Sequence, residues 1–133
     1  MIEKTFKVCL VLFLLVIVSS CTTKPILNYK NERLPTKFDG SAYTQEQVRD
    51  AIMEACQKLG WVGQVREEGI IDASIRIRSY RAEIEIQYDK REISILYKNS
   101  KGLSYFHGSI HHNYNRWVSN LYNSIIKCLP LKS

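Results

Sequence analysis

Three histidines lie close together towards the C-terminal end of the chain, at His107, His111 and His112. His107 and His111 are four residues apart, a spacing at which two imidazoles on one helix can bind the same metal ion. Gly108 lies between them and argues against a continuous helix, and no nearby Cys, Asp or Glu completes a set of ligands. We therefore interpret the histidines as solvent-facing or helix-capping residues, with His107 and His111 as the candidates for a metal site.

A nucleophile and a base also lie side by side, since Ser109 is followed closely by His111 and His112. The sequence around Ser109 has no glycine-flanked nucleophile turn, and no acidic residue nearby would orient a histidine. We therefore expect that the protein is not an enzyme and that it uses no cofactor.

Three arginines, Arg76, Arg78 and Arg81, form the densest group of positive charge in the chain. They suit an anion site, but Glu83 and Glu85 follow directly and neutralise part of the group, as on a solvated surface. Both interpretations stay open, and we treat this region as the candidate ligand or partner face. It comprises Arg76, Arg78, Arg81, Glu83, Glu85 and Lys98.

The arginines belong to a stretch, from Ile70 to Lys98, in which apolar and polar residues alternate. A period of two, with one apolar and one charged face, indicates strands of an antiparallel sheet that is covered on one face only. The apolar members are Ile71, Ala73, Ile75, Ile77, Ala82, Ile84, Ile86, Tyr88, Ile93, Ile95 and Tyr97.

Tight turns would fix the pairing of these strands. A turn at residues 79–80 predicts that Ile75 faces Ile84 and that Arg76 meets Glu83 on the charged side. Each predicted register keeps all apolar residues on one face, which is the condition that usually selects a register.

The neighbouring turns are predicted in the same way. A tight turn at residues 90–91 places Ile86 opposite Ile95, and a three-residue loop before the alternating stretch places Val65 opposite Ile71. On the charged side, Glu83 would also meet Lys98.

One helix is predicted before the strands in the sequence and another after them. Thr44 and Gln47 have the spacing of a capping box, and Gly60 stands where a helix commonly ends. A second apolar stripe at helical spacing runs from Ile110 to Cys128. The predicted fold is α+β and two-layered: a four-stranded antiparallel meander with an N-terminal and a C-terminal helix packed on one face. The strand at residues 92–98 would be a free edge, open to a partner.

Cys56 and Cys128 lie on or beside the apolar stripes of the two predicted helices. Since both helices must cover the same sheet face, and an even pair of cysteines in an oxidising compartment usually bonds, we predict a disulfide between Cys56 and Cys128. Two buried free thiols are the alternative.

The N-terminus has the order of features of an exported protein. Lys4 and Lys7 precede an apolar run at residues 8–18, which is too short to span a bilayer and suits a signal peptide. The following Val18-Ser19-Ser20-Cys21 resembles the lipobox of bacterial lipoproteins, in which small residues precede a cysteine that is acylated and becomes the mature N-terminus.

The resemblance implies a diacylglyceryl group, usually with a further acyl chain, on Cys21. Thr22 stands where Asp typically signals retention in the inner membrane, so the family rule implies the outer membrane. We therefore expect a signal peptide at residues 1–20, the lipidated cysteine with a flexible linker at 21–41, and an α+β domain facing the periplasm at 42–133.

The chain carries a formal net charge of +6, and loss of Lys4, Lys7 and Glu3 with the signal peptide lowers it to +5. Basic charge with interspersed tyrosines is also typical of nucleic-acid binding. Export argues against that partner, and Tyr88 and Tyr97 share the apolar face of the strands. We expect no nucleic acid; lipid headgroups or peptidoglycan suit the charge and the compartment better.

Most of residues 42–128 resembles the small proteobacterial lipoproteins of unknown function. The similarity is carried by the segments 59–61, 79–84, 93–97 and 111–117. It implies no catalytic residue. The expected function is a membrane-tethered interaction or scaffold module that engages envelope proteins or peptidoglycan. The alternative is a binding or sensing module for a small anionic ligand or a metal.

Overall fold

The computed structural model describes residues 22–132, so the predicted signal peptide and Cys21 lie outside the described residues. In chain order the elements are β1 Thr23–Pro25, β2 Tyr29–Arg33, α2 Gln45–Leu59, β3 Val62–Glu67, β4 Ile70–Ile77, β5 Tyr80–Tyr88, β6 Glu92–Lys101, β7 Ser109–His111 and α3 His112–Cys128.

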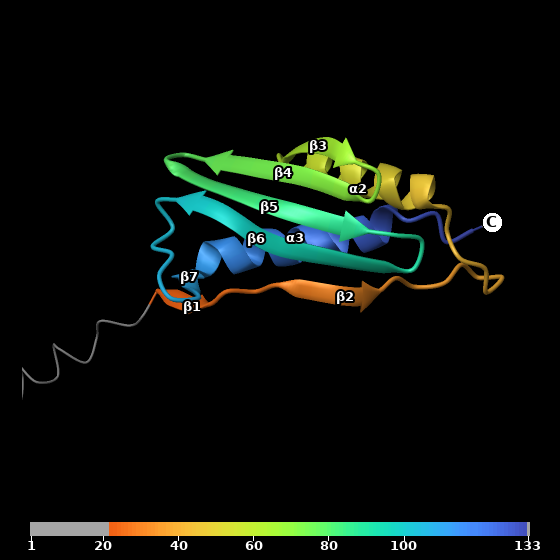
Figure 1. Cartoon of the computed structure of the whole chain (residues 1–133), viewed down its shortest axis with the longest axis horizontal. Coiled ribbons are helices and arrows are strands. Elements are labelled where there is room, and N and C mark those ends of the chain that lie inside the picture. Colours follow the sequence, from red (N-terminus) through yellow and green to blue (C-terminus); the bar gives the residue numbers. More distant parts are fainter. Residues whose placement is uncertain (1–21, 133) are drawn as a thin grey trace, which may run out of the picture.

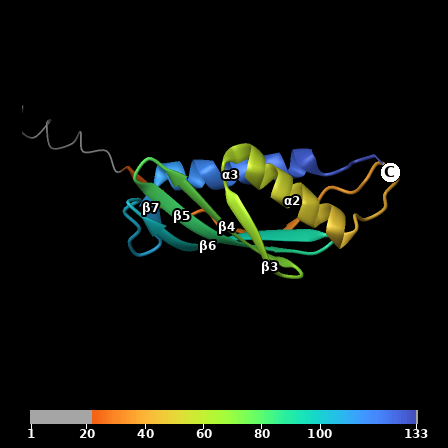
Figure 2. The same cartoon turned by 90° about the horizontal axis from the view of Figure 1, so that it is seen from above.

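An antiparallel sheet of five strands, in the order β2-β6-β5-β4-β3, forms one layer of the fold. Helices α2 and α3 form the other layer, both on the same face of the sheet (Figures 1 and 2). Strands β1 and β7 pair in a separate two-stranded sheet at one end. The α+β class and the meander β3-β4-β5-β6 are confirmed, whereas the predicted number of four strands was one too few.

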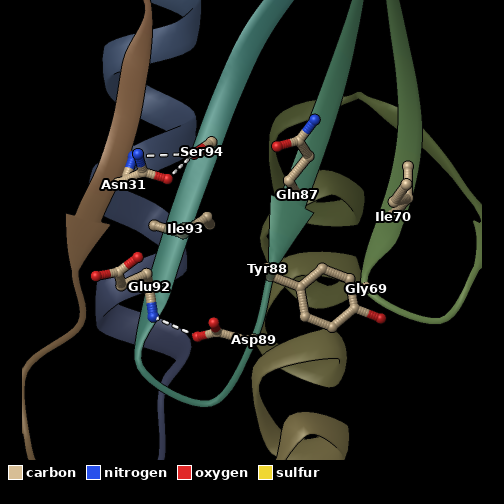
Figure 3. A pocket seen from close by; sticks show the side chains of 9 residues that line it. All are labelled: Asn31, Gly69, Ile70, Gln87, Tyr88, Asp89, Glu92, Ile93 and Ser94. Atoms are coloured by element: carbon tan, nitrogen blue, oxygen red, sulfur yellow. Dashed lines mark hydrogen bonds between the residues drawn. The ribbon is translucent and has the colours of Figure 1, made fainter.

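Strands β1 and β2 correct two predictions: the flexible linker before α2 and the free edge at β6. Residues 22–41 were predicted to be a flexible linker, but β1 and β2 are built into the sheets. Strand β2 pairs along β6, where the Asn31 amide donates a hydrogen bond to Ser94 Oγ at 2.9 Å (Figure 3). Strand β6 is therefore not a free edge. Both short strands lack alternation, and β2 is interrupted by an irregularity, so no period could reveal them.

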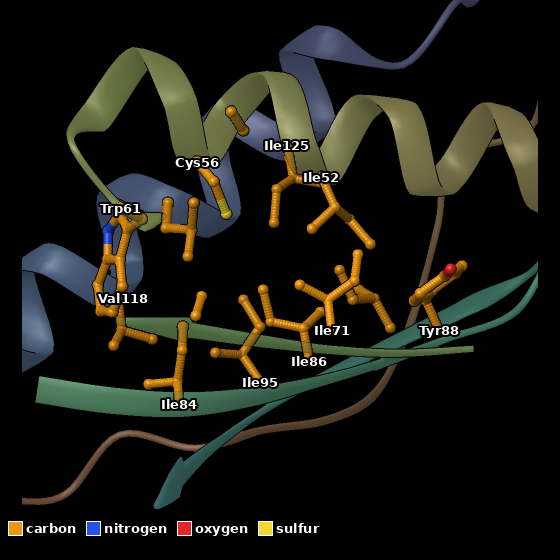
Figure 4. Packing of buried hydrophobic residues seen from close by; sticks show 14 of the residues in the cluster. Ile52, Cys56, Trp61, Ile71, Ile84, Ile86, Tyr88, Ile95, Val118 and Ile125 are labelled. Atoms are coloured by element: carbon orange, nitrogen blue, oxygen red, sulfur yellow. The ribbon is translucent and has the colours of Figure 1, made fainter. Parts of the chain in front are cut away.

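The core lies between the sheet and the helices. Most inward residues of the predicted alternation are buried, and they meet Val48 and Ile52 of α2 and Leu121 and Ile125 of α3. The exceptions are Ile77, which is exposed beside the β4–β5 turn, and Tyr97, which is half-buried. Figure 4 shows Ile52 of α2 pointing towards Ile71 and Ile86 of the sheet. The two helices also contact each other, so together they shield the apolar layer from solvent on the side away from the sheet.

Helix α2 begins and ends where the sequence predicts. The Gln47 amide donates to the Thr44 hydroxyl and the Gln47 side chain accepts from the Thr44 amide, so the capping box is complete. Gly60 follows the helix in the left-handed conformation, with φ 80°, which favours glycine.

The β4–β5 register differs from the prediction by two residues. Ile75 faces Ala82 rather than Ile84, because the chain turns at residues 78–79 with Arg78 in the left-handed conformation at φ 57°. A shift of two leaves each side chain on its predicted face. The earlier turn frees Tyr80 from the loop, and its ring packs 6.4 Å from that of Trp117.

The other two registers are confirmed: Ile86 faces Ile95, and Val65 faces Ile71. The predicted charge pairs are wrong, because Arg76 faces Arg81 and Glu83 faces Ser74 and Asn99.

The predicted disulfide is not formed, and Cys56 and Cys128 are both free. Cys56 is buried and points at the sheet, close to Gly63, and burial raises the pKa of its thiol to about 12 (Figure 4). Cys128 is half-buried, and its Sγ lies 3.8 Å from Lys58 Nζ. The apolar stripes in the sequence predicted the buried faces of α2 and α3 correctly, but they did not predict the directions in which the Cys56 and Cys128 side chains point.

The built-in N-terminal segment leads to a stability prediction. Asn115 of α3 accepts a hydrogen bond from the Leu27 amide at 2.9 Å and donates one to the Pro25 carbonyl at 2.9 Å. Replacing Asn115 with Ala leaves the half-buried Leu27 amide unpaired, so we expect Asn115→Ala to lower the free energy of unfolding by about 1–3 kcal/mol. Urea unfolding and hydrogen exchange of the Leu27 amide measure this effect.

Asn120→Ala is the matched control, because Asn120 is exposed on the same helix. We expect it to change stability by less than about 0.5 kcal/mol. If Asn115→Ala is equally neutral and Leu27 exchanges freely in both proteins, the segment is a linker after all.

Candidate functional site: the charged face of the sheet

The face of the sheet opposite the helices is covered by charged and polar side chains. Alternation along β4, β5 and β6 turns these residues outward because their neighbours are buried under α2 and α3. We call this surface the charged face; it comprises Arg66, Asp72, Arg76, Arg81, Glu83, Glu85 and Lys98.

Two carboxylates face each other at the centre of the charged face. Asp72 and Glu85 are direct partners across β4 and β5, an arrangement of like charges that is unfavourable by itself. Arg66 of β3 bridges them: its Nε lies 2.9 Å from Asp72 Oδ2, and its Nη2 donates to Glu85 Oε2. Lys98 Nζ lies 3.3 Å from Asp72 Oδ1. The four side chains therefore hold one another in fixed positions.

The network shifts the proton affinity of its members. The pKa of the Glu85 carboxyl lies below its ordinary value of 4.5. The main cause is a hydrogen bond that the side-chain Nε2 of Gln87 donates to Glu85 Oε1 at 2.7 Å. Burial opposes this, and the hydrogen bond and charge of Arg66 lower the pKa further. The pKa of Arg66 is raised, chiefly by its hydrogen bond to Glu85. Both shifts favour the charged forms of Glu85 and Arg66 near neutral pH.

A shallow hollow of about 320 Å³ lies beside this network. Its walls include the side chains of Asp72, Arg81, Glu83 and Lys98, and Val62 at its rim is 70% exposed. Arg81 Nη2 is 2.7 Å from Glu83 Oε1. The hollow therefore offers cationic donors, anionic acceptors and one apolar contact to a molecule that lies across the strands.

A second hollow of about 290 Å³ lies farther along the same face, between β2, β6, β5 and the start of β4 (Figure 3). Its floor is polar, and the hydroxyl of Ser94 there already forms hydrogen bonds with the backbone amide and the side chain of Asn31. Asp89 Oδ1 accepts hydrogen bonds from the amides of Arg91 and Glu92, so this carboxylate closes a turn. The first hollow offers the larger number of ionised side chains.

The structure brings four of the six residues of the predicted face together: Arg81, Glu83, Glu85 and Lys98 lie around or beside the first hollow. The other two residues lie nearer the β4–β5 turn. Arg76 is the cross-strand partner of Arg81, next to the pair Ser74 and Glu83, and Arg78 lies in the turn itself.

Two central members, Arg66 and Asp72, were missed as site residues. Asp72 has the same parity as the predicted face along β4, so the alternation could have identified it. Arg66 reaches the face from β3, whose exposed apolar and polar residues give no clear pattern.

The histidines have structural contacts. The His111 side chain accepts a hydrogen bond from the Asn113 amide and caps α3, as the capping interpretation predicts. The His107 ring stacks on Phe106 at 3.9 Å, and His112 Nδ1 lies 3.1 Å from the Thr22 carbonyl. Within residues 22–132, no group of three or more His, Cys, Asp or Glu is placed to hold a metal ion.

The lowered pKa of Glu85 predicts a pH dependence of stability. A carboxyl whose pKa is lower in the folded state favours folding above pH 4.5, and this contribution is lost as the pH falls through the folded pKa. Because Glu85 is partly exposed, we expect a loss of about 0.5 kcal/mol, and at most about 1 kcal/mol. In Glu85→Gln, the free energy of unfolding should change less between about pH 7 and about pH 3 than in the wild type.

Urea titrations at the two pH values measure this difference. Glu68→Gln, in the exposed turn between β3 and β4, is the control and should retain the wild-type slope. Identical pH dependence in the wild type and Glu85→Gln would contradict the network as described.

Within residues 22–132, neither helix has the length and apolar content needed to cross a bilayer.

Comparison with known proteins finds no relative of this chain. No protein-family model matches it, and neither a curated protein nor a solved structure is significantly similar to it.

Proposed function

We propose that this protein is a non-catalytic lipoprotein of the cell envelope, held on the periplasmic side of the outer membrane by an acylated Cys21. Its charged face binds another envelope component, either a protein or peptidoglycan. The observation that carries the proposal is the asymmetry of the sheet. Both helices cover one face, and the opposite face presents ordered charges around a hollow.

The start of the fold supports a short connection to the membrane. The Thr22 carbonyl accepts a hydrogen bond from the His112 amide at 3.1 Å, and β1 begins at Thr23. Consecutive Cα atoms are about 3.8 Å apart, so Cys21 follows the fold at the distance of one residue. Acyl chains on Cys21 would therefore hold the domain directly at the headgroups.

The chemistry of the charged face supports recognition of a partner. Charges of both signs that are fixed by Arg66 and Lys98 give orientation and specificity to an interface. Val62, 70% exposed on β3, adds apolar area at its border. β3 is also an outer strand of the five-stranded sheet, and such a strand can accept a further strand from a partner.

The anchor is tested by labelling cells with radioactive palmitate. We expect the wild-type chain to incorporate the label and to stay with the membranes in a carbonate wash. Cys21→Ala should incorporate none and should leave the membrane fraction. Cys128→Ala is the matched control and should behave as the wild type. Equal labelling or equal retention of the wild type and Cys21→Ala would refute the anchor.

The partner surface is tested by a photo-crosslinking amino acid at Ser74, which lines the first hollow. We expect a specific crosslinked product in intact cells from position 74 and none from Glu54, an exposed position on α2. Lys98→Glu, which introduces repulsion with Asp72, should weaken the product from position 74.

Lys58→Glu is the matched control, because Lys58 Nζ lies 3.1 Å from Glu54 Oε1 and the change likewise reverses one paired lysine. Crosslinks of equal strength from positions 74 and 54, or a product from position 74 that is insensitive to Lys98→Glu, would refute a partner on the charged face.

A further inference from the structure

Segments that are far apart in the sequence meet at the end of the molecule where the described chain begins (Figure 1). β1 pairs with β7, and the Ile26 amide donates to the Gly108 carbonyl at 2.8 Å. The β4–β5 turn lies against the segment 102–108, since a Cβ atom on Gly102 would be 3.2 Å from the Tyr80 ring. We call this end, formed by β1, β7, the β4–β5 turn and residues 102–108, the tether end.

Positive charge is concentrated at the tether end. The segments 22–31, 73–82 and 100–116, which lead into it and out of it, contain seven Lys and Arg and no Asp or Glu. The rest of residues 22–133 contains ten basic and twelve acidic residues. The net positive charge of the domain therefore comes from the part of the chain that meets at this end.

Three of these cations stand in a row across the outward face of the sheet. Arg76 is the direct partner of Arg81 across β4 and β5, and Arg81 is the direct partner of Lys101 across β5 and β6. Like charges that face each other across strands are unfavourable for folding. Arg81 has Glu83 at 2.7 Å, but within residues 22–132 neither Arg76 nor Lys101 forms a salt bridge. The row is an arrangement that an external anion would stabilise.

Exposed aromatic side chains lie beside the cations. The backbones of Phe106 and Ser109 bond reciprocally at 2.9 Å around His107 and Gly108, which have the positive φ values of a type I′ turn. The tight turn keeps Phe106 outside the core, so its side chain is 69% exposed, and Tyr105 before it is 48% exposed. Basic and aromatic side chains together are typical of protein surfaces that lie at a membrane interface.

We propose that the tether end docks on anionic phospholipid headgroups. This proposal rests on the proposed function, because the acylated Cys21 would be adjacent to Thr22 and would bring this end to the bilayer first. Lys24, Arg78 and the row Arg76, Arg81 and Lys101 attract the negatively charged headgroups, and Phe106 enters the interface. The domain then stands on the membrane with the rest of its charged face, Arg66, Asp72, Glu83, Glu85 and Lys98, directed sideways and open to a partner.

The chain offers a matched pair of probes for this orientation. Phe106 and Phe38 are both highly exposed, at 69% and 75%, but Phe38 belongs to the segment between β2 and α2 at the opposite end of the molecule (Figure 1). Full chains carrying Phe106→Trp or Phe38→Trp are reconstituted into vesicles with a nitroxide-labelled headgroup lipid, which quenches tryptophan fluorescence on contact. Vesicles of phosphatidylcholine with phosphatidylglycerol are compared with vesicles of phosphatidylcholine alone.

We expect the tryptophan at position 106 to be quenched in the anionic vesicles and the tryptophan at position 38 to stay unquenched. High salt or neutral lipid should reduce quenching at position 106 towards the level at position 38, because both weaken the attraction to headgroups. Adding Arg76→Glu with Lys101→Glu to Phe106→Trp should reduce it in the same way. Lys90→Glu with Arg91→Glu, in the β5–β6 turn, reverses the same amount of charge and should have no effect.

Flotation of the vesicles separates the two proposals. A chain that floats but shows equal quenching at positions 106 and 38 overturns the docking and leaves the anchor intact. Quenching that is the same in neutral and anionic vesicles, or that survives the double charge reversal, also overturns the docking. So does a tryptophan at position 106 that responds to soluble peptidoglycan fragments but not to vesicles. A chain that floats with neither kind of vesicle overturns both docking and anchor.

Discussion

Burial of one face of the strand meander under α2 and α3 is the constraint on which the rest of the structure depends. Each inward residue of β4, β5 and β6 exchanges water for apolar side chains of the helices, which stabilises the fold by roughly 25 cal/mol for each Å² of apolar area. Residues 22–132 form a single helical layer on one face of the sheet, so polar side chains are favoured on the outward face of the same strands. Arg66, Asp72, Glu85 and Lys98 fill these positions and satisfy one another.

The same constraint explains how much the sequence could predict. Alternation predicted the faces of β4, β5 and β6, and burial of the inward set fixed them even where the β4–β5 register moved by two residues. Strands β1 and β2 are short and depend on backbone pairing and on side chains such as Asn115, so no local period indicated them. The charged face was predicted as a surface, but the predicted charge pairs on it were wrong. The observed pairs depend on the register and on Arg66, which reaches across from another strand.

The distribution of charge gives the domain a direction. The segments that meet at the tether end contain basic but no acidic residues, and the rest of residues 22–133 carries slightly more acidic than basic residues. In the proposed account, the first end meets the membrane and the charged face stays accessible beside it. Exposed aromatic side chains and the row Arg76, Arg81 and Lys101 belong to the same end, whereas the helices serve to stabilise the sheet.

The central functional claim is that the charged face is occupied in the envelope, and carboxyl footprinting tests it most directly. Intact cells and the purified protein are treated with a carbodiimide and an amine, and modification is quantified by mass spectrometry. The account predicts that Asp72 and Glu85 are modified less in cells than in the purified protein, while Glu54, paired with Lys58 on α2, is modified equally in both. Equal modification of Asp72 and Glu85 in the two samples would contradict it.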